Sequence, residues 1–282
     1  MIQLSVQGLS KSFVTKSNLF GRPKAVIPAV RNVSFQVERG QTVALVGESG
    51  SGKSTTARLV LRLLPADSGH VEFDGVDVRN LNTRDLQVFR RKMQIIFQDP
   101  YSSFDPRLSI GESIAEPMLI HFDISHSERW RRATELLERV SMSSDYLHRL
   151  PSELSGGQLQ RAAIARALTL NPQLIICDEA VAALDVSIRA QVLNLLRDLQ
   201  KDFGLSYLFI THDLGLVRAF ADHVYLMSAG EIVESGAVNT VFSNPQMPYT
   251  QQLFAAIPAL KPHRRMNSPD RSTLCKGQAD GS

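Results

Sequence analysis

The feature that most constrains this chain is a short apolar run followed by a loop of glycine and serine. Residues 41–46 are largely apolar and end at Gly47, which predicts a buried strand. The next nine residues read Gly47-Glu48-Ser49-Gly50-Ser51-Gly52-Lys53-Ser54-Thr55 and match the pattern GxxxxGK[ST]. Residues 53–64 then have the composition of a helix, closed by Pro65 and a turn at residues 67–69. A strand, a glycine-rich loop and a helix in this order form a phosphate-binding unit.

Each residue type in this loop has its own chemical purpose. The glycines let the backbone N–H groups turn inward around phosphates, and the following helix offers the positive end of its dipole. Lys53 can reach the β- and γ-phosphates of a nucleotide, and the Ser54 hydroxyl can bind Mg²⁺. The alternative is a glycine turn that happens to precede a lysine, and it leaves the flanking strand and helix unexplained.

Three further apolar runs, at residues 174–177, 207–210 and 224–227, also predict buried strands. Between them, one helix face is marked by Ile188, Val192, Leu195, Leu196, Leu199 and Phe203, and Gly204 ends this helix. Strands that alternate with helices predict an α/β fold with a largely parallel sheet covered on both faces. Residues 104–150 carry charges at helical spacing and predict a mostly helical insertion, and helical pattern resumes at residues 155–168.

The strand at residues 174–177 leads into two carboxylates, Asp178 and Glu179. Asp178, at the carboxyl end of the strand, is placed to hold Mg²⁺ through water. Glu179 faces the same crevice and can polarise an attacking water molecule. Strands often end in acidic residues, so the pair gains its meaning from the phosphate-binding loop.

Composition excludes several other classes of protein. The 282 residues suit one large α/β domain, and the formal net charge of +3 does not predict nucleic-acid binding. The two cysteines, Cys177 and Cys275, form no CxxC pair and suit a reducing cytoplasm, with Cys177 as a small core residue. We expect neither a signal peptide nor a membrane span, so that, if the chain works at a membrane, partners must hold it there. The tail from Lys261 is expected to be disordered and solvated rather than bound to anionic lipid.

The segment Leu154-Ser155-Gly156-Gly157-Gln158 decides between the remaining readings. It lies between the phosphate loop and the acidic strand, and it resembles the LSGGQ signature of the ABC ATPase family over all five residues. Ser155 would begin a helix whose positive end, with the exposed N–H groups of Gly156 and Gly157, suits a γ-phosphate. The alternative is a simple serine N-cap with a glycine turn.

This resemblance implies roles for four more residues, each a weak signal alone. Gln98 is similar to the Q-loop glutamine that contacts Mg²⁺ or water, and His212 to the switch histidine at the γ-phosphate. Asp185 matches the D-loop, with a plain helix N-cap as its alternative. Phe13 matches the aromatic residue that stacks on adenine, and Phe20 is a rival because an insertion at about residues 14–27 disturbs the alignment. Outside this family, Phe13 would be an ordinary core residue and His212 an ordinary strand-end histidine.

Three stretches, residues 97–107, 184–192 and 242–250, resemble the importers of oligopeptides, dipeptides and nickel. The chain departs from them at Ala180, where many relatives carry Pro, and at Ala182 and Met247, which replace Ser and His. None of these changes removes a phosphate, metal or water ligand. Some relatives hold an iron–sulfur cluster through several C-terminal cysteines, but Cys275 alone provides too few ligands, so we expect no cluster.

The resemblance implies a P-loop NTPase core of ABC ATPase type, with an N-terminal antiparallel β part and an inserted α-helical subdomain. The ATPase domain would span residues 1–235, with the helical subdomain at about residues 99–170. An importer-type C-terminal extension would span residues 236–260, and a disordered tail residues 261–282.

It also implies the function of an ATP-binding and ATP-hydrolysing subunit that uses Mg²⁺ and energises an importer of peptides, nickel, glutathione or a similar solute. Its partners would be a second ATPase subunit, two integral-membrane permeases and an extracytoplasmic solute-binding protein, at the cytoplasmic face of the bacterial inner membrane. The signature residues of one ATPase would complete the ATP site of the other, and relatives often pair two different ATPases, which favours a heterodimer over a homodimer.

A soluble ABC ATPase of translation or DNA repair is the alternative, but such proteins usually carry two cassettes or long coiled-coil insertions. An exporter ATPase, commonly fused to a membrane domain, is a third reading.

Overall fold

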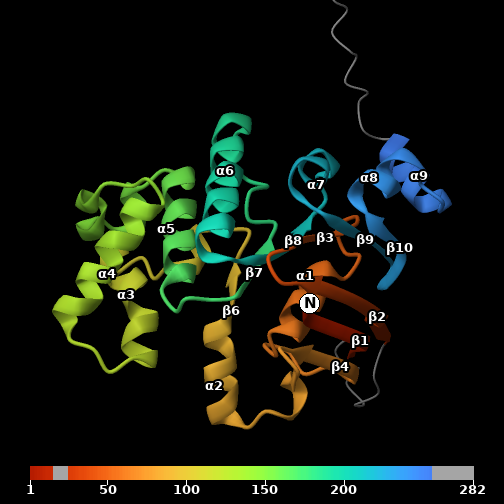
Figure 1. Ribbon diagram of the computed structural model, residues 1–282, viewed down its shortest axis with the longest axis horizontal. Coiled ribbons are helices and arrows are strands. Elements are labelled where there is room, and N and C mark those ends of the chain that lie inside the picture. Colours follow the sequence, from red (N-terminus) through yellow and green to blue (C-terminus); the bar gives the residue numbers. More distant parts are fainter. Residues whose placement is uncertain (15–24, 256–282) are drawn as a thin grey trace, which may run out of the picture.

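The computed structural model describes residues 1–14 and 25–255 of the chain (Figure 1). Phe20, Cys275 and the tail from residue 261, for which the sequence gave expectations, lie outside these residues. None of the helices in the described ranges combines the length and the apolar character needed to cross a bilayer.

A six-stranded sheet forms the centre of the molecule. In spatial order its strands are β10 (Glu231–Ala237), β9 (His223–Ser228), β3 (Thr42–Val46), β8 (Ser206–Thr211), β7 (Leu174–Asp178) and β6 (Met93–Ile96). Neighbours from β9 to β6 pair in parallel, and β10 adds an antiparallel edge. Every residue of β3, β7 and β8 is buried, as expected of parallel strands covered on both faces. The predicted largely parallel sheet is therefore confirmed.

A second, antiparallel sheet is built from the N-terminal part of the chain. Its order is β2 (Val26–Glu38), β1 (Ile2–Val14), β4 (Ser68–Phe73) and β5 (Val76–Asp77). One hydrophobic cluster joins this sheet to α1 (Lys53–Val60) and to Val43 and Leu45 of β3. The helix that follows the phosphate loop is thus packed between the two sheets, which fixes the direction in which its N-terminus points.

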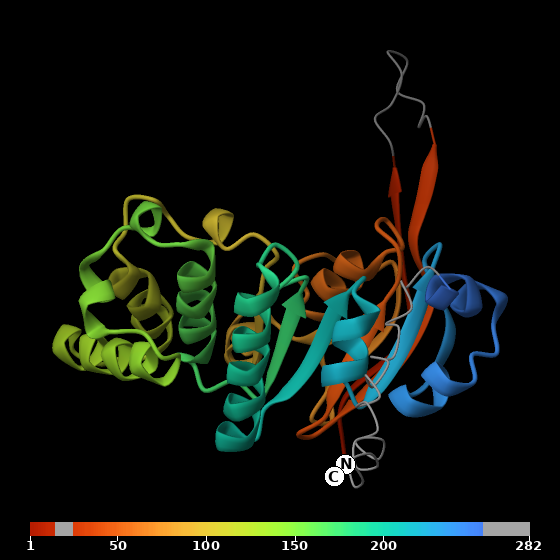
Figure 2. The same cartoon turned by 90° about the horizontal axis from the view of Figure 1, so that it is seen from above.

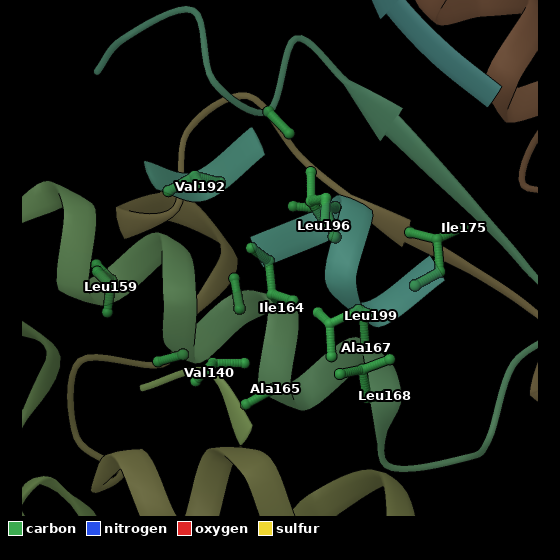
Figure 3. Close-up of a cluster of buried hydrophobic side chains, with 14 of the residues drawn as sticks. Val140, Leu159, Ile164, Ala165, Ala167, Leu168, Ile175, Val192, Leu196 and Leu199 are labelled. Atoms are coloured by element: carbon green, nitrogen blue, oxygen red, sulfur yellow. The ribbon is translucent and has the colours of Figure 1, made fainter. Parts of the chain in front are cut away.

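Helices cover the opposite face of the central sheet. They are α5 (Gly156–Leu168), α6 (Val186–Phe203) and α7 (Leu214–Phe220). Helix α2 (Thr83–Lys92), which precedes β6, is not one of them. Figure 3 shows Leu159 and Ile164 of α5 packed with Val192, Leu196 and Leu199 of α6. Five of the six residues predicted for the apolar stripe of α6 face this core, but Phe203 does not and is 41% exposed. Gly204 ends the helix at φ 64°.

A group of helices lies at one end of the long axis of the molecule (Figures 1 and 2). It comprises α3 (Ile110–His121), α4 (His126–Arg139) and α5, with single 3₁₀ turns at Tyr101–Ser103, Ser144–His148 and Pro151–Glu153. Ser109, Ser125 and Ser155 cap α3, α4 and α5 by accepting backbone N–H groups of the first turn. The helical insertion expected in the fold class is therefore present.

The sequence prediction was wrong about where the first helix ends. It placed the end at residue 64, but α1 ends at Val60 because Arg62 adopts a left-handed φ of 51°. The N–H groups of Leu63 and Leu64 both turn back to the Arg58 carbonyl. The predicted turn at residues 67–69 is likewise shorter, since β4 already starts at Ser68. A 3₁₀ turn at Val78–Asn80 continues the chain from β5.

Two short helices, α8 (Val238–Ser243) and α9 (Pro248–Ala255), lie at the other end of the molecule from α3 and α4 (Figures 1 and 2). They follow β10 and pack near α7 and β9. The side chains of β3 alternate between the two faces of the sheet, so Val43 and Leu45 meet α1 while Ala44 and Val46 meet α7 and α8. β3 is therefore in contact with both the phosphate-loop helix and the C-terminal helices.

Candidate functional site

The loop at residues 47–52 connects β3 to the N-terminus of α1. Gly50 and Gly52 have φ values of 81° and 106°, which side-chain-bearing residues rarely adopt. A Cβ at Gly47 would collide with the Met227 carbonyl oxygen, and one at Gly52 with the Ala29 carbonyl oxygen. The glycines are required by backbone conformation and by the close approach of β2 and β9 to the loop.

Lys53, the first residue of α1, is only 4% exposed. Its ammonium group donates to the carbonyl oxygens of Gly47 at 2.7 Å and Glu48 at 2.8 Å. Burial lowers the pKa of Lys53, against the opposing effect of the nearby carboxylates Glu179, Asp178 and Glu48. The loop therefore encloses a cationic donor beside the free N–H groups at the start of a helix, the combination that binds phosphate.

Ser54 and Asp178 come together although they lie far apart in sequence. The Ser54 hydroxyl donates to Oδ1 of Asp178 at 2.8 Å, and Asp178 is 5% exposed at the end of β7. Burial raises the pKa of Asp178, while the hydrogen bond from Ser54 and the charges of Arg58 and Lys53 favour the carboxylate. Hydroxyl and carboxylate oxygens are hard donors, so this pair fits a magnesium ion.

Glu179 and His212 form the next pair. Oε1 of Glu179 lies 3.2 Å from Nδ1 of His212, which follows β8. Glu179 has a positive φ of 50°, and its N–H group donates to the Ile210 carbonyl at 2.9 Å. A non-glycine residue in this region costs on the order of 1–3 kcal/mol, which the surrounding structure must offset. The backbone of Glu179 is therefore fixed against β8, with its side chain directed towards His212.

These residues surround one pocket of about 270 Å³, whose lining is Ala29, Ser49, Gly50, Gly52, Lys53, Ser54, Thr55, Gln98 and Glu179. Gln98 is exposed and reaches the pocket from the segment that follows β6. Asp178 lies beneath Ser54, and His212 contacts Glu179 at the rim. The pocket is smaller than the roughly 300–1,000 Å³ of sites that enclose a ligand, as expected if a second surface completes it.

The residues Ser155, Gly156, Gly157 and Gln158 do not line this pocket. They begin α5, where the Ser155 and Gln158 side chains form a reciprocal capping box and Gln158 also donates to the Tyr146 hydroxyl at 2.8 Å. A Cβ added at Gly156 would meet no atom within 4 Å. At this end of α5, Ser155 is exposed and Gly156 is half-buried, whereas Gly157 is buried against Ile188. The signature residues therefore lie apart from the phosphate loop of their own chain, with Ser155 and Gly156 open to a second surface.

Asp185 stands at the N-cap position of α6, but its side chain makes no capping hydrogen bond. Its neighbour Val186 is 81% exposed. The plain N-cap interpretation therefore does not account for the Asp185 carboxylate.

Phe13 lies on β1, opposite Ile27 of β2, and is 41% exposed. It does not line the pocket, although Ala29 of β2 does. Its contact with adenine stays a prediction. The rival Phe20 lies outside the described residues.

Sequence reasoning missed three residues that contact the site. Ala29 and Met227 place backbone carbonyls against the loop glycines, and backbone contacts leave no mark on the residue type. Arg189 links the segment after Glu179 to Asp213, beside His212. A signal for Arg189 existed, because a cation in the first turn of a helix opposes the helix dipole and therefore suggests a specific acidic or carbonyl partner.

Comparison with known proteins agrees with this geometry. The family model described as ABC transporter matches residues 30–182, more than half of the chain. A second model, the C-terminal region of oligopeptide/dipeptide transporters, matches residues 233–277, of which the structure describes those up to 255.

Among curated proteins, the glutathione import ATP-binding protein GsiA of Escherichia coli K12 and that of Shigella flexneri are each 50% identical over 262 residues. The match covers 93% of this chain but only 42% of either relative, so the chain spans less than half their length.

Among solved structures, the bacterial ABC transporter cassette MJ0796, determined as a dimer, superposes with a TM-score of 0.74 at 29% identity, over 83% of this chain and 98% of that one. The transporter component cbiO1 of Clostridium perfringens gives a TM-score of 0.73 at 26% identity, over 86% and 91% of the two chains. Since the family model matches more than half of the chain, the chain belongs to the ABC transporter family of ATP-binding cassettes, in the branch of the oligopeptide/dipeptide transporters.

Proposed function

We propose that this chain is the ATP-binding and ATP-hydrolysing subunit of an importer for peptides or a related small solute, such as glutathione or nickel. The observation that carries the proposal is one pocket lined by Lys53, Ser54, Gln98 and Glu179. Asp178 is hydrogen-bonded to Ser54, and His212 contacts Glu179. The importer branch is supported by the matched C-terminal region and by the likeness to GsiA.

In this proposal the triphosphate of ATP lies along the loop from Gly47 to Thr55. The Lys53 ammonium group and the N–H groups of the loop and of the first turn of α1 stabilise its negative charge. Ser54, Asp178 and Gln98 are the residues that would hold Mg²⁺, whose chemistry is to neutralise charge on the phosphate oxygens.

Glu179 is proposed as the general base. Its carboxylate accepts a proton from water as the water oxygen bonds to the γ-phosphorus and the bond to the β,γ-bridging oxygen breaks. Nδ1 of His212 lies 3.2 Å from this carboxylate, which supports the proposal that the imidazole contacts the γ-phosphate. The fixed backbone of Glu179 keeps the base in place without a conformational search.

The second wall of the site is proposed to come from another cassette. Ser155, Gly156, Gly157 and Gln158 at the N-terminal end of α5 would contact the γ-phosphate bound by the partner, and Asp185 would lie at the same interface. ATP then favours the closed dimer by contacts that the open one lacks, and hydrolysis removes them. The partner is a related chain or a second copy, and a heterodimer is our preference.

The further partners are two integral-membrane permeases and an extracytoplasmic solute-binding protein, with the chain held peripherally at the cytoplasmic face of the bacterial inner membrane. The helical group α3–α5, joined to the site by the segment at Gln98, is the proposed docking surface for the permeases. We propose no iron–sulfur cluster, because the sequence offers only Cys275 in the C-terminal region.

The experiment that tests this function is purification of the tagged chain from membranes of its own cells in mild detergent. We expect two integral-membrane permeases and a second ATPase to copurify, and the complex to hydrolyse ATP faster when its loaded solute-binding protein is added. Copurification with ribosomes or DNA-repair proteins instead would contradict transport and favour the soluble ABC ATPases.

A further inference from the structure

The C-terminal helices are packed directly on the strand that leads into the phosphate loop. Val238 and Val241 of α8 share one hydrophobic cluster with Ala44 and Val46 of β3, and Leu253 and Phe254 of α9 pack against it. Phe242 and Phe254 stack with ring centroids 4.5 Å apart, which ties α8 to α9. α8 and α9 therefore share a hydrophobic core with β3.

Tyr249 of α9 extends this contact from the strand to the loop itself. Its hydroxyl accepts the N–H group of Glu48 at 3.3 Å and lies 3.5 Å from the Met227 carbonyl oxygen. The same Met227 carbonyl closes the space beside Gly47. One hydroxyl group thus bridges the start of the phosphate loop and the end of β9.

Glu48 connects this outer contact to the inside of the loop. While its N–H group faces Tyr249, its carbonyl accepts the Lys53 ammonium group at 2.8 Å and the Ser51 N–H group at 3.2 Å. A rotation of the peptide planes around Glu48 would therefore move an acceptor of Lys53. On the neighbouring side, the Gly230 N–H group donates to the Ser51 carbonyl at 3.0 Å, so the loop is held from two segments.

The position of Tyr249 is itself fixed by β10. The two carboxylate oxygens of Glu234 accept the N–H groups of Gln246 at 2.8 Å and Met247 at 3.1 Å, immediately before α9. Thr250, next to Tyr249, is fully buried. The segment that carries the Tyr249 hydroxyl is thus held by charge-assisted hydrogen bonds and by packing.

We propose that Tyr249 is a positioning residue for the phosphate loop, through which the C-terminal extension sets the affinity of the cassette for ATP. The proposal rests on the proposed ATP binding and assigns the extension a part in it. Through its hydrogen bond, Tyr249 fixes the orientation of the Glu48 peptide, and with it the carbonyl that accepts the Lys53 ammonium group. The loop thereby keeps the conformation that binds a polyphosphate. It touches no reacting atom, so it acts on binding and not on the chemical step.

Removal of the hydroxyl alone tests this proposal, with Tyr249→Phe as the variant and Tyr225→Phe as its matched control. Tyr225 also offers a hydroxyl to a backbone N–H group, that of Gln36 at 3.2 Å, but it does so away from the loop. One backbone hydrogen bond corresponds to roughly a two- to tenfold change in an equilibrium constant. We expect the Kd for Mg-ATP to rise about fivefold in Tyr249→Phe. We expect kcat of the assembled transporter to be unchanged, and the Glu48 amide resonance to shift in nitrogen–proton spectra.

The control and a second variant make the result decisive. Tyr225→Phe should leave the Kd for ATP unchanged. Glu234→Gln removes one of the two carboxylate oxygens that accept the N–H groups before α9, and it should raise the Kd as Tyr249→Phe does. Equal affinities in wild type, Tyr249→Phe and Glu234→Gln would overturn the proposal, and so would an equal loss in Tyr249→Phe and Tyr225→Phe. If the wild-type chain bound no ATP at all, the proposed function itself would fail.

Discussion

Arg189 and Asp213 form an ion pair that holds the two halves of the candidate catalytic centre together. Nη1 of Arg189 lies 2.8 Å from Oδ2 of Asp213, the residue after His212. Nη2 of the same guanidinium donates to the carbonyl oxygens of Leu184 at 3.1 Å and Ala182 at 3.4 Å. The segment that follows Glu179 and the segment that carries His212 are therefore joined by one side chain.

The first prediction concerns Arg189. Arg189→Gln should lower kcat roughly ten- to hundredfold, because small misplacements of a base are costly to the chemical step, while the Kd for ATP changes little. Arg189→Lys should recover only part of the rate, since an ammonium group can pair with Asp213 but cannot match the planar fork. Steady-state kinetics with ATP-binding titrations check this. A wild-type kcat in Arg189→Gln would contradict it.

The second prediction concerns Glu179. Glu179→Gln should keep ATP binding but reduce hydrolysis roughly 10²- to 10⁴-fold, because an amide cannot accept the proton of water. The ATP-bound dimer should then persist and elute as such in size-exclusion chromatography with Mg-ATP. Turnover at the wild-type rate would refute the role of Glu179 as general base.

The third prediction uses the open space at Gly156. Since an added Cβ there meets no atom of its own chain, Gly156→Ala should fold with an unchanged melting temperature and bind ATP normally. Hydrolysis and ATP-driven dimer formation should fall roughly 10²-fold or more, because the methyl group would lie between the helix end and the phosphate held by the partner. Normal turnover would mean that this surface does not complete an ATP site.

The fourth prediction is a dependence of stability on pH. Burial disfavours the charge on Glu234, but the Gln246 N–H group, the Thr250 side chain and the Met247 N–H group together outweigh it and hold the pKa below its ordinary 4.5. A carboxyl group with a lowered pKa in the folded state stabilises the fold above its unfolded pKa, and this stabilisation is lost as the pH falls through the folded pKa. Glu234→Gln should therefore melt at a lower temperature than wild type at pH 7, and the difference should shrink on acidification below about pH 4.5. A difference that does not change between pH 7 and pH 3 would be the contrary result.

The fold was largely predictable because its central strands are buried on both faces. Such strands appear in sequence as short apolar runs, and those at β3, β7, β8 and β9 were located within one or two residues. The end of α1 was not predictable, since Leu63 and Leu64 continue the helical composition while the chain turns at Arg62. The left-handed conformation there is imposed by packing of the tertiary structure and has no glycine to announce it.

The candidate site was predictable where a motif fixes the local backbone and not where distant segments meet. The loop from Gly47 to Thr55 and the acidic strand end were identified from spacing alone, and the structure brings them to one pocket together with Gln98. The backbone contacts of Ala29 and Met227 depend on the register of two sheets. The contact between Tyr249 and Glu48 joins segments about 200 residues apart, so only the packed core defines it.

The most direct test of the whole account is the affinity of the purified chain for ATP. Titration calorimetry with a non-hydrolysable ATP analogue and Mg²⁺ should give saturable binding to wild type and to the surface control Lys201→Ala. Lys53→Ala should bind at least tenfold more weakly, because the buried ammonium group at the centre of the loop is gone. Equal binding by Lys53→Ala, or no binding by wild type in the presence of its partner cassette, would contradict the claim that this loop holds a nucleotide triphosphate.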